Sequence, residues 1–156
     1  SIHMNASASG SGIGLETFLL SSKSSSEEVN ALVAREQEAL PINASTTEVR
    51  KEELDTLIYD LELRAAHSIS EKLASLVQRV PVATPGATDR GVKQAPFAVL
   101  KEAEMPAIVL ECGFLTHPVE GAKLLDLEYQ VKLANGLTRA LIKFDDVLSA
   151  ESEDSP

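Results

Sequence analysis

Several residue types are scarce in this sequence, and each shortage excludes a class of protein. A single cysteine, Cys112, rules out a disulfide within the chain. No apolar run reaches the ~18 residues that a membrane-spanning helix needs. Only 14 Lys and Arg stand against 24 Asp and Glu, and the resulting net charge of -10 disfavours nucleic acid and anionic lipid surfaces as partners. The 156 residues, 44% of them hydrophobic, suit one globular domain with a substantial core.

Segments with strand character alternate with segments of helical character. Residues 1–3 and 14–21 are predicted strands, and residues 97–102 and 106–114 are predicted to form two more, joined by a short turn. The run 107–110 is apolar at consecutive positions, which is typical of a strand covered on both faces. Residues 81–96 hold three prolines and two glycines, which predicts a loop. The alternation indicates an α/β domain with helices on both faces of a sheet.

Two capping-box patterns predict where helices begin. Ser25 and Glu28 have this spacing and predict a helix that runs to about Leu40. Ser45 and Glu48 repeat the spacing before an apolar stripe that fits either two helices or one bent helix, with a break near residues 65–68.

The last third of the chain also has helical signals. Pro118 suits the first turn of a helix, and residues 129–144 form an amphipathic pattern. Residues 146–156 are acidic, lack an apolar anchor and are predicted to be disordered.

Two polar residues next to strand-like runs are candidates for chemistry. His3 lies at the end of the first predicted strand, and Glu111 lies at the end of the apolar run 107–110. Ligands of open α/β sheets bind beyond the carboxyl ends of the strands, where a histidine could bind a metal and a carboxylate could act as a general base. Cys112 suggests a thiol nucleophile, but no Cys–His pairing is evident, and a small buried residue is the simpler interpretation.

Five blocks of sequence occur in an order that points to one family. They are "SIHMNA", "GLETFLLS", "DRGVK", "FAVLKEAEMPAIVLECGFLTHP" and the last helix. Together they resemble the zinc-dependent N-acetylmuramoyl-L-alanine amidases, which cut peptide stems from peptidoglycan, over nearly all of residues 1–145. The resemblance implies a twisted, mostly parallel sheet flanked by helices, with one zinc in a surface cleft. It also implies that the protein acts outside the cytoplasm. It also implies that His3 is a zinc ligand and that Glu111 is the catalytic carboxylate.

The resemblance also implies that part of the metal site lies before Ser1. The family's other two ligands, a His and a Glu, precede the strand with which this chain opens, so residues 1–145 match the C-terminal part of a catalytic domain. Neither His67 nor His117 occupies a family ligand position. His117 stands where Asn is usual, which predicts a softer start to the following helix. Two alternatives remain: an expression leftover at residues 1–4, and a non-catalytic cell-wall-binding or interaction module on the same fold.

Residues 41–66 are an insertion relative to simpler members of the family. The stretch "LIYDLELRAAHSISEKLA" resembles the inserted segment of division-associated amidases, in which a helix lies across the zinc cleft and inhibits. Some members add a zinc ligand from this helix, and the sequence offers three candidates for it: Glu48, Glu52 and Glu53. The segment between Ser45 and Ala65 is therefore expected to plug the cleft until an activator protein displaces it. Permanent packing of its apolar stripe as ordinary core is the alternative.

Overall fold

The computed structural model describes residues 1–21, 23–38, 53–80, 84, 86–101 and 103–153, with the backbone alone described for 53–63 and 153. Four strands form one sheet: β1 (Ile2–Asn5), β2 (Leu15–Leu20), β3 (Asp89–Ala95) and β4 (Val109–Phe114). Their order is β1-β4-β2-β3. The β1–β4 and β2–β3 pairs are parallel and the β2–β4 pair is antiparallel. The predicted α/β class with a mostly parallel sheet is confirmed.

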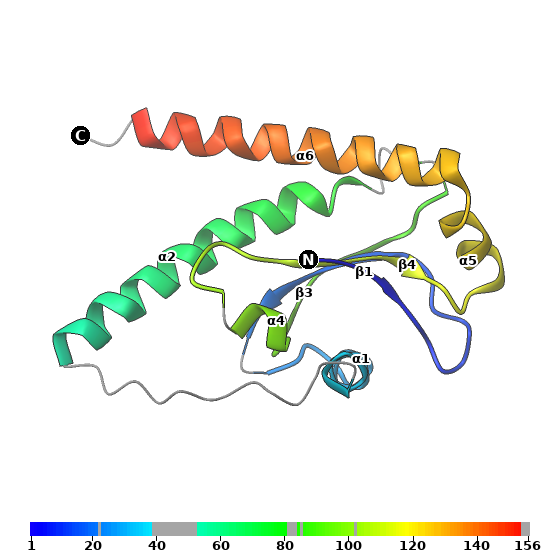
Figure 1. Ribbon diagram of the computed structural model, residues 1–156, viewed down its shortest axis with the longest axis horizontal. Coiled ribbons are helices and arrows are strands. Elements are labelled where there is room, and N and C mark those ends of the chain that lie inside the picture. Colours follow the sequence, from blue (N-terminus) through cyan, green and yellow to red (C-terminus); the bar gives the residue numbers. More distant parts are fainter. Residues whose placement is uncertain (22, 39–52, 81–83, 85, 102, 154–156) are drawn as a thin grey trace.

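Helices cover the two faces of the sheet separately (Figure 1). The long helices α2 (Glu53–Val77) and α6 (Leu127–Glu153) lie on one face, and α5 (Pro118–Leu124) precedes α6. On the other face lie α1 (Glu27–Glu38) and the short α4 (Ala98–Lys101). Side chains alternate along β4, so Leu110 and Cys112 join the core under α2 and α6, whereas Val109 joins the core under α1. Glu111 consequently faces α1.

Two predicted elements between residues 81 and 102 are wrong. Residues 89–95, expected in a loop, form β3 because they pair in parallel with β2, and this pairing stabilises a segment that holds Gly91. Residues 98–101, expected in a strand, form α4. Phe97 and Leu100 lie three residues apart, and both are buried in the core under α1, which fits a helical turn better than a strand.

The first two helices refine the predicted boundaries. The hydroxyl of Ser26, not that of Ser25, accepts a hydrogen bond from the backbone N–H of Val29 (3.3 Å). The Ser25 hydroxyl instead donates to the carbonyl of Gln94 and accepts from its N–H. Helix α2 runs without interruption to Val77, so residues 53–77 form one helix rather than two, with no break near residues 65–68. Leu40, Pro41 and the second capping box lie outside the described residues.

The acidic end of the chain is helical as far as Glu153, so the prediction of disorder from residue 146 is wrong for residues 146–153. Packing between α2 and α6 explains the difference, and the Lys72 ammonium pairs with the Glu151 carboxylate at 2.5 Å. Residues 154–156 lie outside the described part. None of the described helices is long and apolar enough to cross a membrane.

The start of α5 is well capped. Pro118 occupies its first turn, as predicted, and Nδ1 of His117 accepts the amides of Val119 (3.3 Å) and Glu120 (3.1 Å). The ring nitrogen thus caps the helix as the usual Asn side chain would. The weaker capping of this helix expected from the sequence is not observed.

Candidate metal and catalytic site

His3, Glu36 and Glu111 meet under α1. His3 on β1 lies beside Glu111 on β4 in the register of the parallel pair, and Glu36 reaches them from the last turns of α1. One possible ligand atom from each of the three residues lies within 4.8 Å of the others. A nitrogen and two carboxylate oxygens at this spacing are a donor set that suits zinc.

The site lies on the face of the sheet rather than beyond the ends of its strands. Glu111 is the third of six residues in β4, and all six are buried, so the strand does not end at the charged residue as the sequence suggested. The backbone of Glu111 pairs with β1 on one side and with β2 on the other, so the strand continues past this residue. A strand is more rigid than a loop, so it holds the carboxyl group in a fixed place.

Glu111 is a buried acid without a hydrogen-bonding partner. It has 0% exposed surface, and neither carboxyl oxygen has a partner among the described residues. The pKa of Glu111 is raised from 4.5 to about 8, chiefly by burial and also by the charges of Glu36 and Glu16, while the charge of Arg35 opposes the shift. A buried polar group left unsatisfied in this way is characteristic of a site that acts on a ligand.

The raised pKa predicts how the stability of the metal-free chain depends on pH. Folding favours the protonated acid, so ionisation of this group costs no stability below pH 4.5, and stability falls as the pH rises from 4.5 to about 8. The loss is up to about 5 kcal/mol at 1.36 kcal/mol for each pH unit. We expect Glu111→Gln to remove this loss, so that urea unfolding in a chelator shows a more stable variant at pH 8.5 and little difference at pH 4. Equal stabilities at pH 8.5 would contradict the burial of an ionisable group here.

Glu36 is a site residue that was not among the residues predicted from the sequence. Its Oε2 lies 3.1 Å from Nδ1 of His3, while Nε2 of His3 lies 2.8 Å from the Ser1 hydroxyl. A signal for it existed: the buried residues Val29, Leu32 and Val33 form a stripe on α1, and Glu36 continues that stripe at helical spacing. Of the glutamates proposed instead, Glu48 and Glu52 lie outside the described residues, and only the backbone of Glu53 is described.

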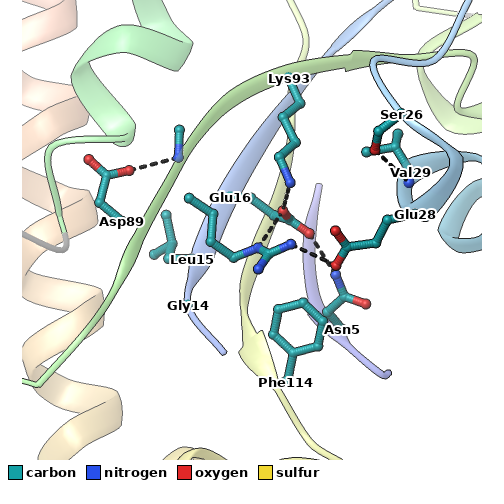
Figure 2. Close-up of polar contacts among 12 residues, drawn as sticks. Asn5, Gly14, Leu15, Glu16, Ser26, Glu28, Val29, Asp89, Lys93 and Phe114 are labelled. Carbon is teal, nitrogen blue, oxygen red and sulfur yellow. Dashed lines mark hydrogen bonds and ion pairs between the residues drawn. The ribbon is translucent and has the colours of Figure 1, made fainter. Parts of the chain in front are cut away.

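Glu16 lies directly opposite Glu111 in the β2–β4 register, and the two acids differ in their surroundings. The Glu16 carboxylate accepts hydrogen bonds from Nδ2 of Asn5 (2.8 Å), Nε of Arg90 (2.8 Å) and Nζ of Lys93 (2.5 Å). Figure 2 shows Lys93 and Asn5 reaching this carboxylate from two sides. Glu16 is thus a satisfied structural charge, which leaves Glu111 as the carboxyl group available for chemistry.

The other candidate residues lie apart from this cluster. Nε2 of His67 is 3.4 Å from Glu71 on α2, and His117 caps α5. Cys112 faces the opposite core, and burial together with the charge of Glu111 raises the pKa of its thiol to about 11. A buried thiol with a raised pKa does not suit the role of a nucleophile.

Comparisons with known proteins agree on one family. Residues 1–143 match the family described as N-acetylmuramoyl-L-alanine amidase. The amidase LytC of Bacillus subtilis is 30% identical over 119 residues, which cover 76% of this chain and 24% of that protein. AmiA of Salmonella typhimurium is 26% identical over 145 residues, covering 92% of this chain and 50% of that protein.

Solved structures give the same picture. An N-acetylmuramoyl-L-alanine amidase from Clostridium difficile 630 matches with a TM-score of 0.59 and 29% identity, over 94% of this chain and 56% of that one. The catalytic domain of CwlV from Bacillus (Paenibacillus) polymyxa shares the fold, with a TM-score of 0.60 and 24% identity over 94% of this chain and 56% of that domain. The chain thus spans about half of these structures and half or less of the sequence relatives above.

Proposed function

The chain belongs to the N-acetylmuramoyl-L-alanine amidase family, and we propose that it carries part of the catalytic site of a zinc-dependent peptidoglycan amidase. The bond cleaved is the amide between the lactyl group of N-acetylmuramic acid and L-alanine. One observation carries the proposal: the buried carboxyl group of Glu111 lacks a hydrogen-bonding partner among the described residues and lies beside His3 and Glu36. Such an enzyme would act outside the cytoplasm, where its substrate is.

We infer that His3 and Glu36 hold the metal, together with the His and the Glu that the family resemblance places before Ser1. A zinc ion held by these residues would supply activation of a bound water and polarisation of the substrate carbonyl. The donor cluster supports this inference because its nitrogen and oxygen atoms already lie within 4.8 Å of one another.

Glu111 is the general base in this proposal. Its carboxylate takes a proton from the water that attacks the amide carbon, and the same group then gives a proton to the departing amine of L-alanine. The side chain needs no reorganisation for this, because it projects from a paired strand in the middle of the sheet. Glu16 cannot replace it, since three donors already occupy that carboxylate.

Helix α1 is the part of the described chain that covers the site. Its Glu36 contacts His3, its Arg35 guanidinium contacts the carbonyl of Ala6, and Nε2 of its Gln37 donates to the carbonyl of Pro96 at 3.3 Å. We therefore propose that the inhibiting segment includes the end of α1, and that an activator protein would act by drawing this helix away. The proposed role of the segment 45–65 rests on side chains that lie largely outside the described residues.

Hydrolysis by the complete protein that carries this chain tests the proposal. With purified peptidoglycan, we expect new L-alanine amino termini without new reducing sugar ends, since an amide rather than a glycosidic bond is cut. A chelator should abolish the release, and added zinc should restore it. Binding to peptidoglycan without any release of amino groups would instead establish a non-catalytic wall-binding module.

A further inference from the structure

Arg90 on β3 carries a guanidinium group that is fixed on its inner side. Its Nε donates to Oε2 of Glu16 at 2.8 Å, and its guanidinium carbon lies 5.1 Å from the centre of the Phe114 ring. The Glu16 side chain is 3% exposed, so the inner partner is a buried charge. The side chain is therefore held in one orientation before any ligand arrives.

The outer side of the same guanidinium has a different kind of partner. Its Nη2 donates at 2.7 Å to Oε1 of Glu28, a residue in the first turn of α1 whose side chain is 63% exposed. An ion pair with so exposed a carboxylate is weak, and another carboxylate can replace it readily. Because Glu28 belongs to the helix that covers the candidate site, moving α1 would release these outer donors.

A hollow of about 530 Å³ is lined by residues that contact this arginine. It lies between α1 and the chain that follows β1, and its lining includes Glu16, Glu28 and Phe114, the three side chains that contact the Arg90 guanidinium. Figure 2 shows these three residues grouped around one point of the sheet. A ligand in the hollow would therefore lie next to Glu28, the outer partner of Arg90, and a carboxylate on that ligand could take the place of the Glu28 carboxylate.

The distance from Glu111 suits a short peptide. Strand β3 is two strands away from β4, a separation of about 10 Å at the usual strand spacing, and the side chains on both strands shorten the gap. One residue of extended peptide covers about 3.5 Å, so a group on the residue after the scissile alanine lies ~7 Å from the reacting bond.

We propose that Arg90 binds a free carboxylate on the residue that follows L-alanine in the peptide stem, and that Glu28 occupies this position while α1 covers the site. The identity of the substrate rests on the function proposed above. Arg90 is then a specificity residue, because it favours binding of stems with a free carboxylate at this position over stems in which that group is amidated. Guanidinium groups suit the task because their donors match the two oxygens of a carboxylate.

A pair of capped dipeptides tests this in the 156-residue chain without metal. One is acetyl-L-alanyl-D-glutamic acid with its γ-carboxyl blocked as a methylamide, and the other has the α-carboxyl amidated as well. In Glu28→Gln, which removes the competing carboxylate, we expect the free acid to bind about tenfold more tightly than the amide, the effect of one charge-assisted hydrogen bond. The wild-type chain should bind the acid several-fold more weakly than this variant. NMR titration gives both affinities.

Two further variants link the preference to Arg90. In the Glu28→Gln background, Arg90→Gln should bind both dipeptides equally. Arg90→Lys should keep only part of the preference, because an ammonium group attracts a carboxylate but does not match its two oxygens. Arg139→Gln on the exposed face of α6 removes one positive charge elsewhere and should keep the preference. Equal binding of the two dipeptides by Glu28→Gln, or binding of neither, overturns the assignment. A retained preference in a complete protein that hydrolyses nothing would instead contradict only the proposed function.

Discussion

Glu111→Gln is expected to lower hydrolysis of the N-acetylmuramoyl–L-alanine bond by at least ~100-fold while zinc remains bound. The amide has nearly the same shape as the carboxyl group but cannot accept the proton of the attacking water, and acid–base catalysis typically contributes a factor of this size or more. The side chain is completely buried in the middle of β4, and three donors already occupy Glu16, the acid opposite it, so Glu16 cannot take over its role. Turnover and metal content should both be measured on the complete protein.

A matched substitution separates this loss from a general effect of removing a negative charge. Glu71→Gln changes the same residue type on α2, where the carboxylate is exposed and pairs with His67. It should leave turnover within about a factor of two, as surface substitutions usually do. If Glu111→Gln retained near-normal turnover with zinc bound, another group would have to be the base.

Glu36→Ala is expected to raise basal hydrolysis about tenfold in the complete protein and to weaken zinc binding. The substitution removes the contact between α1 and His3, and a charge-assisted bond of this type is worth about 1.5–3 kcal/mol. The bond stabilises only the closed state, in which α1 covers the site. Losing it therefore shifts the population towards molecules in which α1 has left the site. Initial rates and a competitive zinc titration report the two effects.

The control for this prediction lies on the same helix. Glu38→Ala removes a carboxylate two residues further on, where the side chain is exposed, and should change neither quantity. Val29, Leu32 and Val33 are unchanged in both variants, so neither substitution alters the apolar packing of α1, and the two variants differ only in the carboxylate removed. A fall in hydrolysis for Glu36→Ala would show that Glu36 serves catalysis itself, and α1 would then be part of the working site rather than its cover.

Local patterns were sufficient for the elements with a strong hydrophobic signal. The apolar run before Glu111 predicted a buried strand, and the helical spacing in α1, α2 and α6 reflects the faces that those helices bury. The pattern was insufficient for residues 81–102. Strand β3 forms because β2 offers a parallel partner, which no short window of sequence contains.

In the candidate site, too, some residues could be predicted from local sequence and others depend on contacts between distant segments. The sequence by itself indicated His3 and Glu111, since each follows a strand-like run and both match blocks of a known family. It could not reveal that Glu36 joins them, that Glu16 lies opposite Glu111, or that Arg90 links β3 to α1, because these contacts bridge between 33 and 95 residues of chain. Only the tertiary structure decided them: strand pairing and helix packing bring distant charges together, and burial then determines which of those charges keeps a partner.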